Sequence, residues 1–445
     1  MRPILSLALA ALAALASGVV IPRQDEPFLQ EYDAIIVGGG PAGLAALSGL
    51  ARVRRNVLLV DSGEYRNAPT RHMHDVLGFD GNHSPSLGPL KPPKLTCHPL
   101  SGVTPAYFRY AAREQISHYT TVRMINGTVL KITPDANQPA KFTVHVGVNP
   151  DGGRGLTLTA RKIILATGLR DVLPSTPGIA ENWGKGIFWC PWCDGHEHAD
   201  QELGLLGSLD NVPGAVREML TLNTDIVAFV NGTSTPELRA TTEAKSPGWE
   251  KYLRVHGVVV DNRTITGITR LQDGGGEEAD PSLPSVAEFD RFRVDFTEGE
   301  PVERAAFLAA FPSEQTSKVG EEMGVNLYGG RLAADQSAGL VTNIPGVYAI
   351  GDANSDNVTN VPHALFSGKR TAVYLHGLSP LDLVLSTSGM VANSLPTVRL
   401  AREDGEEDIA GPDVTKRELE HAARSLWETV NGGPSDILYA GEFDQ

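Results

Sequence analysis

A glycine turn between a short apolar run and a helix constrains this chain more than any other feature. Residues 33–43 read DAIIVGGGPAG, and the following LAALSGLARV is typical of a helix. The glycines of a G-x-G-x-x-G turn permit tight bending, close approach of the backbone to a pyrophosphate and tight packing of helix on strand. The helix N-terminus then offers free N–H groups to the phosphate charge. The sequence therefore predicts a dinucleotide-binding α/β domain whose ligand contacts are Gly38, Gly40, Pro41, Ala42 and Gly43.

A second apolar run, NVLLVD at residues 56–61, supports this prediction because it ends in an acid, Asp61, followed by Ser62. A carboxylate at that place accepts hydrogen bonds from the hydroxyl pair of a ribose and repels a 2′-phosphate. The expected ligand is therefore FAD or NAD, not NADP. A glycine-rich turn in some other α/β domain is the alternative.

Two of the three cysteines lie close together in the stretch FWCPWCDGHEHAD, at Cys190 and Cys193. A disulfide that closes so short a loop constrains the unfolded chain little, which disfavours a structural staple. Zinc is also disfavoured, because Cys97 is far away in sequence and only His196 and His198 could complete a site. A redox-active dithiol is the favoured interpretation, and no metal is expected.

Two later segments complete a recognisable order of motifs. KIILATGLRDVLP ends a strand in Ala166, Thr167 and Gly168, and NIPGVYAIGDAN ends another in Gly351 and Asp352. G-x-G-x-x-G, ATG, C-x-x-C-D and a late GVYAIGD, in this order, resemble the thioredoxin reductase-like flavoproteins over residues 30 to about 380. The resemblance implies an α/β fold with two Rossmann-like, three-layer ββα nucleotide-binding domains, the second inserted into the first. It also implies FAD as cofactor and a homodimer.

The resemblance assigns roles to the residues of these motifs. Cys190 would exchange with the substrate, Cys193 would face the flavin, and Asp194 would help to move protons. The stretch EYRNAPTRHMHD is similar to the flavin-contacting loop of the fungal dithiol oxidases. The flavin contacts implied in all are Asp352 at the ribityl chain, His363 and Ala364 near the isoalloxazine, and Arg66, Asn67 and His74 from that loop.

The pattern of the N-terminal residues and the resemblance together divide the chain. A signal peptide would occupy residues 1–18, the FAD-binding domain residues 30–180 and 302–380, and the inserted NAD(P)H-like domain with the C-x-x-C residues 181–301. Residues 381–445 would form a C-terminal extension.

The second nucleotide site departs from the pattern of the NADPH-using members. In ELGLLGSLDNVPGAVREM, Gly207 can be the first glycine, but Leu209 stands where the second should let the backbone approach the pyrophosphate. Pro213 and Gly214 follow where the helix should be running, and the next strand lacks the basic cluster that grips a 2′-phosphate. We therefore expect that this second site no longer binds NADPH.

The N-terminal MRPILSLALAALAALASG has a positive residue, an apolar run and small residues, the pattern of a secretory signal peptide. Glycosylation sequons start at Asn82, Asn126, Asn231, Asn262 and Asn357. A formal net charge of −15 disfavours nucleic acid and anionic membranes as partners. A secreted, glycosylated protein is expected.

These observations favour a secreted FAD-dependent thiol oxidase. Electrons would pass from a small thiol or dithiol substrate through Cys190 and Cys193 to FAD, and then to O2, giving H2O2. An NADPH-dependent disulfide reductase is the alternative, and a flavin-binding protein without turnover is a third. The substrate stays open between a small metabolite, glutathione and protein cysteines, because the pair encloses Pro-Trp and the signal peptide departs from the fungal dithiol oxidases.

Overall fold

The structure is a computed structural model, and it describes residues 28, 31–77, 79, 103–136, 138, 141–147, 155–275 and 285–377. The expected signal peptide, the C-terminal extension, Cys97 and Asn82 lie outside the described residues. Within the described part of the chain, no helix is long and apolar enough to cross a membrane.

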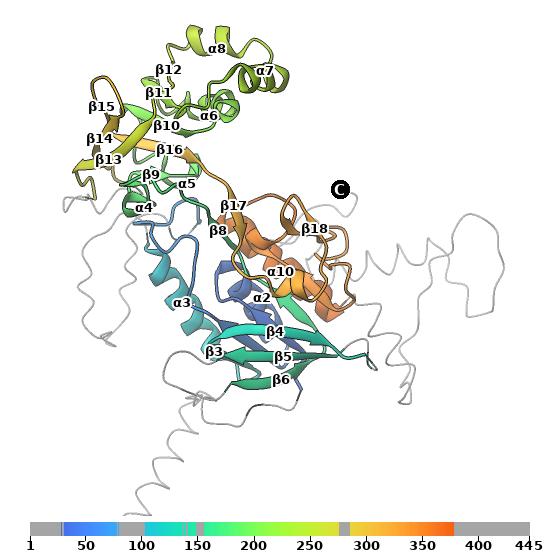
Figure 1. The fold of residues 1–445 in the computed structure, drawn as a ribbon. Helices are drawn as coiled ribbons and strands as arrows, with labels where there is room; N and C mark the ends of the chain where they lie inside the picture. Colours follow the sequence, from blue (N-terminus) through green and yellow to red (C-terminus); the bar gives the residue numbers. More distant parts are fainter. Residues whose placement is uncertain are drawn as a thin grey trace, which may run out of the picture. The chain divides into compact units, whose positions relative to one another are not determined.

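The first sheet is parallel and carries the glycine turn on its central strand (Figure 1). Its strands other than the edge strand β3 are largely apolar and buried on both faces, as parallel strands covered on two sides are. In sheet order they are β20 (Val347–Ala349), β7 (Ile163–Leu165), β1 (Ala34–Val37), β2 (Val57–Asp61) and β3 (Val122–Asn126).

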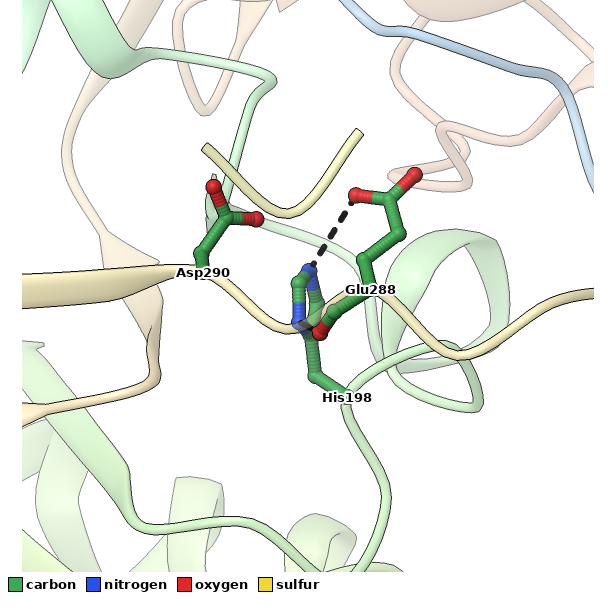
Figure 2. A group of neighbouring side chains, drawn as sticks. All are labelled: His198, Glu288 and Asp290. Carbon is green, nitrogen blue, oxygen red and sulfur yellow. Dashed lines mark hydrogen bonds and ion pairs between the residues drawn. The ribbon is translucent and has the colours of Figure 1, made fainter. Parts of the chain in front are cut away.

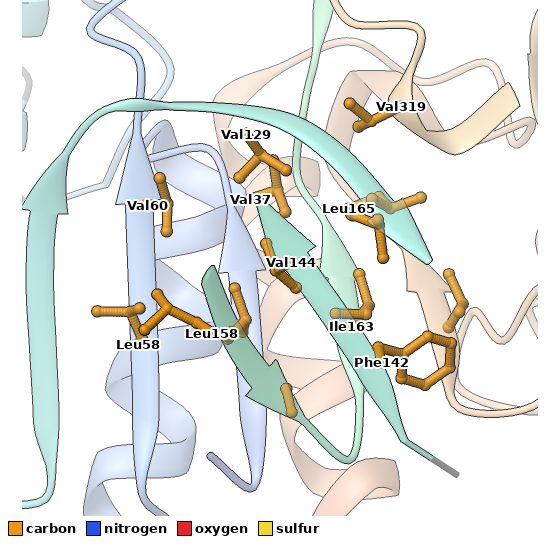
Figure 3. Packing of buried hydrophobic residues seen from close by; sticks show 14 of the residues in the cluster. Val37, Leu58, Val60, Val129, Phe142, Val144, Leu158, Ile163, Leu165 and Val319 are labelled. Atoms are coloured by element: carbon orange, nitrogen blue, oxygen red, sulfur yellow. The ribbon is translucent and has the colours of Figure 1, made fainter. Parts of the chain in front are cut away.

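One face of this sheet is covered by an antiparallel sheet of β4 (Thr128–Pro134), β5 (Phe142–Gly147) and β6 (Leu156–Ala160). Figure 3 shows side chains of the two sheets meeting in one apolar cluster, with Val129, Phe142 and Val144 from the second sheet. The cluster fixes the sheet whose carboxyl edge holds the glycine turn.

Helices cover the other face: α2 (Pro41–Arg52), α3 (Pro105–Ser117) and α10 (Val361–Gly377). Helices α2 and α10 approach closely because both carry glycine at the contact. A Cβ on Gly368 would lie 2.2 Å from the Ala42 carbonyl oxygen, and one on Gly49 would lie 2.7 Å from the Cβ of Ala372. This contact sets the start of α10 beside the glycine turn.

The inserted domain has a second parallel sheet, in the order β12 (Val259–Asp261), β11 (Ile226–Phe229), β10 (Leu203–Gly207), β16 (Ala306–Ala310) and β9 (Ile187–Phe188). Helices α6 (Val212–Met219), α7 (Pro236–Lys245) and α8 (Trp249–Val255) belong to it, as do the antiparallel strands β13 (Ile265–Gln272), β14 (Arg291–Phe296) and β15 (Val302–Arg304). The two-domain α/β fold expected from the sequence is confirmed.

Both predicted domain boundaries need correction. The chain leaves the first domain through β8 (Leu169–Asp171) and returns through β17 (Ser313–Gln315), and these two strands pair with each other. The predicted return at residue 302 is wrong because the apolar β16 is paired on both sides inside the second sheet. The predicted departure at residue 180 is also late, because the Ile268 N–H already binds the Pro177 carbonyl on the inserted side.

The remaining short elements are α4 (Ile179–Asn182), α5 (Pro191–Asp194), η2 (Leu209–Asn211), α9 (Val319–Glu322), β18 (Leu327–Tyr328), β19 (Arg331–Leu332) and η3 (Gly351–Ala353). Four of them, α4, α5, η2 and η3, carry residues that line one of two cavities.

Candidate active site

A cavity opens where β1 ends and α2 begins, and most of the predicted flavin contacts line it. They come from four segments distant in sequence: the glycine turn, the loop after β2, the turn after β7 and the start of η3 and α10. The predicted contacts that line it are Gly38, Gly40, Pro41, Ala42, Ser62, Arg66, Asn67, His74, Ala166, Thr167, Gly168, Gly351, Asp352 and Ala364.

The glycine turn is built as the sequence predicts. Gly38 has a φ of +109°, and a Cβ there would lie 2.3 Å from the Ala166 carbonyl oxygen. A Cβ on Gly40 would meet no atom within 4 Å, so the backbone is open to a ligand there. No side chain caps α2, so its first N–H groups are free to bind an anion.

Gly43 does not line the cavity. A Cβ there would lie 2.0 Å from the Gly38 carbonyl oxygen, so this glycine lets the helix pack under the turn. Its predicted ligand contact is therefore corrected to a packing role, which is the third glycine's part in such a turn.

Asp61 also differs from its prediction. It is 2 % exposed, does not line the cavity, and uses its carboxylate inside the protein. It accepts hydrogen bonds from the Tyr65 hydroxyl (2.5 Å) and the Gly63 N–H (3.0 Å), and it forms an ion pair with Arg113. Burial, followed by the hydrogen bond to Asp61, raises the pKa of Tyr65. Asp61 thus holds the loop that presents Ser62, instead of reaching a ribose itself.

Arg66 joins the cavity to the strand that leaves the domain. Its guanidinium binds Asp171 with two hydrogen bonds of 2.6 and 3.0 Å and donates to Asp352 at 3.2 Å. It also lies 5.5 Å from the ring centroid of Trp189. Burial raises the pKa of Asp352, and the charge of Arg66 opposes that effect.

His363 is not at the cavity, in contrast to its prediction. Its imidazole Nε2 lies 2.6 Å from an Asp356 carboxylate oxygen. The backbone N–H of His363 donates to the Asn360 side-chain oxygen at 2.8 Å. The neighbouring Ala364, Val361 and Pro362 line the cavity instead. The imidazole therefore stabilises the start of α10.

The two cysteines form a disulfide whose ends face differently. Cys190 precedes α5 and Cys193 lies within it, with 5.2 Å between their Cα atoms. Cys193 and Asp194 line the cavity, whereas Cys190 does not. This is the arrangement that the predicted order of electron transfer requires.

Buried charges surround Asp194. Burial raises the pKa of its carboxyl well above the usual value, the negative charges of Glu288 and Glu197 raise it further, and Arg71 acts in the opposite direction. His74, which lines the cavity, lies 3.5 Å from Glu197 through its Nε2. The carboxyl of Asp194 is therefore poised to exchange protons closer to neutral pH than an exposed aspartate.

Glu288, one of the acids near Asp194, belongs to a group of side chains with His198 and Asp290 (Figure 2). The His198 Nε2 lies 3.7 Å from a Glu288 carboxylate oxygen, and the imidazole stacks on Phe188 at 5.5 Å. Burial lowers the pKa of His198, although Glu288 and Asp290 act in the opposite direction. A buried histidine of this kind is held neutral, so it serves packing and orientation.

His198, Glu288 and Asp290 have the residue types and spacing of metal ligands. However, Arg71 donates to Asp290 at 2.8 and 2.9 Å and pairs with Glu288, and Arg270 donates to Asp290 at 2.6 Å. The two guanidinium groups already balance the carboxylates. The geometry therefore assigns this group to holding the loop around Asp194.

A second cavity of about 700 Å³ lies at the carboxyl ends of β10, β11 and β16, where an NADPH-using enzyme would bind its nucleotide. Leu209 does not obstruct it as expected from the sequence. Its side chain is fully buried in the domain core, and its N–H donates to the Thr233 hydroxyl at 3.1 Å. The turn is therefore closed by its backbone, whose N–H is no longer free for a phosphate.

Charge also disfavours a phosphate at this turn. Asp210 accepts a hydrogen bond from Ser208 at 2.6 Å and pairs with Lys245, and the hydrogen bonds from Lys245 and Ser208 lower its pKa. Arg239, after the next strand, pairs with Glu250 at 2.5 Å. Lys245 and Arg239 are thus already paired, and Asp210 brings a negative charge to the turn.

Similarity to known proteins agrees with this geometry. Residues 32–368 match the family described as pyridine nucleotide-disulphide oxidoreductase. The chain belongs to that family. A probable thioredoxin reductase of Arthroderma benhamiae is 42 % identical over 370 residues, covering 81 % of this chain and 84 % of that protein. Thioredoxin reductase tcpT of Claviceps purpurea is 30 % identical and covers 76 % and 90 %.

Among solved structures, an oxidoreductase from Agrobacterium tumefaciens has a TM-score of 0.60 at 25 % identity, covering 78 % of this chain and 97 % of that one. HlmI has a TM-score of 0.60 at 28 % identity, covering 80 % and 95 %. The resemblance to thioredoxin reductase-like flavoproteins, including fungal ones, is thereby confirmed, and the protein is a disulfide oxidoreductase of this kind.

Members of this pyridine nucleotide-disulphide oxidoreductase family bind FAD, and the first cavity fits that group. Gly40 leaves the backbone open, and the start of α2 offers free N–H groups to a pyrophosphate. Thr167, which lines the cavity, has a buried hydroxyl without a partner among the described residues. FAD is therefore the cofactor, held between the glycine turn, the loop around Arg66 and the start of α10.

Sequence reasoning missed the partners that connect these segments. Tyr65 and Arg113 bind the carboxylate of Asp61. Arg71 and Glu288 form an ion pair, and their charges act on Asp194. Arg71 and Glu288 lie 217 positions apart, so no local pattern relates them. Tyr65 sits in the stretch that resembles the flavin-contacting loop, which was the one available signal.

Proposed function

We propose that this chain is a secreted, FAD-dependent thiol oxidase that forms disulfides in a small thiol or dithiol substrate and uses O2 as the acceptor. The turn after β10 carries the proposal: the Leu209 N–H is bonded to Thr233, and Asp210 is an acid where a phosphate would bind. Electrons that do not enter through NADPH have to enter through thiols.

The thiol step uses the disulfide. A substrate thiolate attacks the Cys190 sulfur, the S–S bond breaks, and Cys193 leaves as a thiolate beside the first cavity. A second substrate thiolate then attacks the mixed disulfide, which releases Cys190 and leaves the substrate as a disulfide. Two protons leave the substrate thiols, and one electron pair resides on the cysteine pair.

When bound, FAD accepts this electron pair and passes it to O2, which takes up two protons and becomes H2O2. Cys193 would hand over the pair, since it lines the cavity and Cys190 does not. Trp192, 69 % exposed between the two cysteines, offers an apolar contact to the substrate.

Asp194 serves the proton side of the reaction. Its raised pKa makes the carboxyl a stronger base than an ordinary aspartate, so it can take a proton from a thiol and return it. His74 lines the cavity and lies beside Glu197, whose negative charge contributes to the raised pKa of this carboxyl.

Anaerobic stopped-flow absorbance tests the proposal. The FAD-loaded protein is mixed separately with NADPH and with dithiothreitol, and air is then admitted. We expect bleaching by dithiothreitol alone, followed by recovery of the yellow colour with release of H2O2. Fast bleaching by NADPH would show that the second site still works and that the protein is a reductase.

Replacement of one cysteine separates turnover from flavin binding. Cys193→Ser should retain bound flavin but lose its reduction by dithiothreitol. Cys97→Ser is the matched control and should bleach like the natural protein. Rapid bleaching of Cys193→Ser would contradict the electron path given above.

An NADPH-dependent disulfide reductase is the second candidate. It is favoured by the relatives named thioredoxin reductase and by the cavity of about 700 Å³ that the second domain retains. It predicts saturable NADPH binding with reduction of the flavin, which the stopped-flow experiment measures directly.

Secretion, glycosylation and dimer formation are further parts of the proposal. The four described sequon asparagines, Asn126, Asn231, Asn262 and Asn357, are exposed, which supports glycan attachment. Expression in a secreting fungal host should give a protein in the medium whose mass falls after peptide:N-glycosidase treatment. Light scattering on the deglycosylated protein should give twice the chain mass.

A further inference from the structure

The second cavity has an aromatic wall that a nucleotide phosphate does not need. The Trp183 ring stacks on Trp189 with 4.9 Å between centroids and an angle of 15°, and Phe311 lies 5.7 Å from Trp183. All three line the cavity. Trp183 is buried, so the partly exposed rings of Trp189 and Phe311 are the ones that a ligand can reach. These rings favour a flat ring system, because offset stacking adds to the free energy of apolar burial.

The rest of the lining is apolar with a few uncharged polar groups. Buried side chains of the sheet, such as Phe229 and Leu308, form the floor, and the hydroxyls of Ser208 and Thr233 lie at its edge. A volume of about 700 Å³ is in the range of sites for small organic ligands. Size and polarity therefore suit a compact ligand with one or two hydrogen-bonding groups.

Charge selects against anions. Among the described residues that line the cavity, the charged side chains are Arg66, Asp171 and Glu218. Arg66 and Asp171 neutralise each other through two hydrogen bonds, so Glu218 leaves the lining negative. An uncharged ligand avoids both the repulsion and the cost of burying an unpaired charge.

We infer that this cavity binds an uncharged, flat, largely apolar small molecule in place of a dinucleotide. The inference rests on the proposed function at one point, namely that NADPH does not occupy this cavity. The ligand is either the body of the thiol substrate or a separate effector, and both present the same ring chemistry to Trp189 and Phe311.

The cavity is connected to the redox centre. Arg66, Trp189 and Thr359 line both this cavity and the first one. Trp189 directly precedes Cys190, so a ring held against the aromatic wall lies next to the residue that begins the disulfide segment. A ligand in this cavity therefore contacts Trp189, the residue that precedes the disulfide segment.

Gly214 offers a way to fill the cavity without touching either cysteine. It lines the cavity on α6, and a Cβ there would meet no atom within 4 Å, so Gly214→Trp places a ring into the space. Arg217→Trp is the matched control, because this exposed residue on the same helix does not line the cavity.

Binding is measured first, by calorimetry on the FAD-loaded full chain. The uncharged probe 2-naphthol should bind saturably, and 2-naphthyl phosphate should bind roughly tenfold more weakly because of its charge. Gly214→Trp should abolish 2-naphthol binding, and Arg217→Trp should retain it. Absence of saturable binding, or equal binding by Gly214→Trp, would overturn the inference.

Two dithiols then distinguish the substrate from an effector. If the substrate's body binds here, 1,2-benzenedimethanethiol should bleach the flavin with a kcat/KM about tenfold above that of dithiothreitol. Gly214→Trp should remove that preference, whereas Arg217→Trp should keep it. If an effector binds here, 2-naphthol should change the rate with dithiothreitol without competing, and Gly214→Trp should cancel the change.

The outcome for NADPH keeps the two proposals separate. Flavin bleaching by NADPH that is lost in Gly214→Trp would make the cavity a nucleotide site, and both proposals would fail together. No bleaching by NADPH and no binding of 2-naphthol would overturn this inference alone and leave the thiol oxidase standing.

Discussion

The turns after β1 and β10 both follow the carboxyl end of a buried parallel strand, but they offer different groups to a ligand. After β1, Gly40 is open and no side chain caps the helix. After β10, the Leu209 N–H is bonded to Thr233, and Asp210 brings a negative charge. The two turns thus differ in the backbone N–H groups and the charge that they offer to a phosphate, while both keep the strand and a cavity.

The largest expected effect comes from comparing one glycine of each turn. Gly43→Ala should abolish FAD binding, because the new Cβ would lie 2.0 Å from the Gly38 carbonyl oxygen. Gly207→Ala, the control in the second turn, should change the free energy of unfolding by less than about 1 kcal/mol, since its nearest contact would be 3.3 Å. The ratio of flavin to protein absorbance and chemical denaturation measure the two effects, and retained flavin in Gly43→Ala would contradict the packing role.

Asp194→Asn tests the acid at the first site. Thiol-dependent flavin reduction should fall by roughly a hundredfold, the usual worth of a general acid or base. The raised pKa also predicts a change in stability. The unfolded chain ionises Asp194 at a lower pH than the folded one, so the carboxylate destabilises the fold above its unfolded pKa.

Thermal unfolding of Asp194→Asn against the natural protein measures that stability change. The variant should gain stability relative to the natural protein as the pH rises from acid to neutral, and it should gain none where both states are protonated. A constant difference at every pH would contradict the assignment.

Leu209→Gly sharpens the comparison, because it supplies the glycine that the sequence pattern lacks. The structure predicts no gain of NADPH binding, since the backbone N–H at this position stays bonded to Thr233. Loss of a fully buried leucine should lower the free energy of unfolding by about 2–5 kcal/mol. NADPH titration and chemical denaturation measure the two effects, and acquired NADPH binding would show that the side chain was the obstacle.

Asp210→Asn should have the smallest effect. The ion pair of Asp210 with the exposed Lys245 contributes up to about 1 kcal/mol at neutral pH. Because the pKa of Asp210 is lowered, this stability is present above the unfolded pKa and is lost as the pH falls through the folded value. Denaturation at neutral and acid pH should therefore give a difference that fades in acid.

The sequence could predict features that local patterns encode. The turn at Gly38 and Gly40, the pairing of two Rossmann-like domains and the cysteine pair beside the flavin cavity all follow from motifs in which each residue has one steric or chemical reason. The sequence also shows that the second turn lacks a glycine, but the expected obstruction by the Leu209 side chain is wrong, because that side chain is buried in the core and it is the backbone N–H that is bonded to Thr233.

Features that depend on distant partners could not be predicted. Asp61 turned inward because Arg113 comes from α3, and His363 turned away because Asp356 lies beside it. The return boundary was misplaced because β16 is a central strand of the second sheet, which no composition change marks. A motif therefore predicts where the backbone turns. It predicts the direction of a charged side chain less well.

The place of β20 and α10 in the first domain has a consequence for synthesis. β7 pairs with β20, and α2 packs on α10, so neither early element has its final partner until residues beyond 347 have been made. At ~5–20 residues/s, the ribosome needs roughly 10–40 s to pass from one strand to the other. The inserted domain is therefore synthesised completely before the FAD-binding domain is. A chain that stopped before β20 would contain the whole inserted domain but would lack part of the FAD cavity.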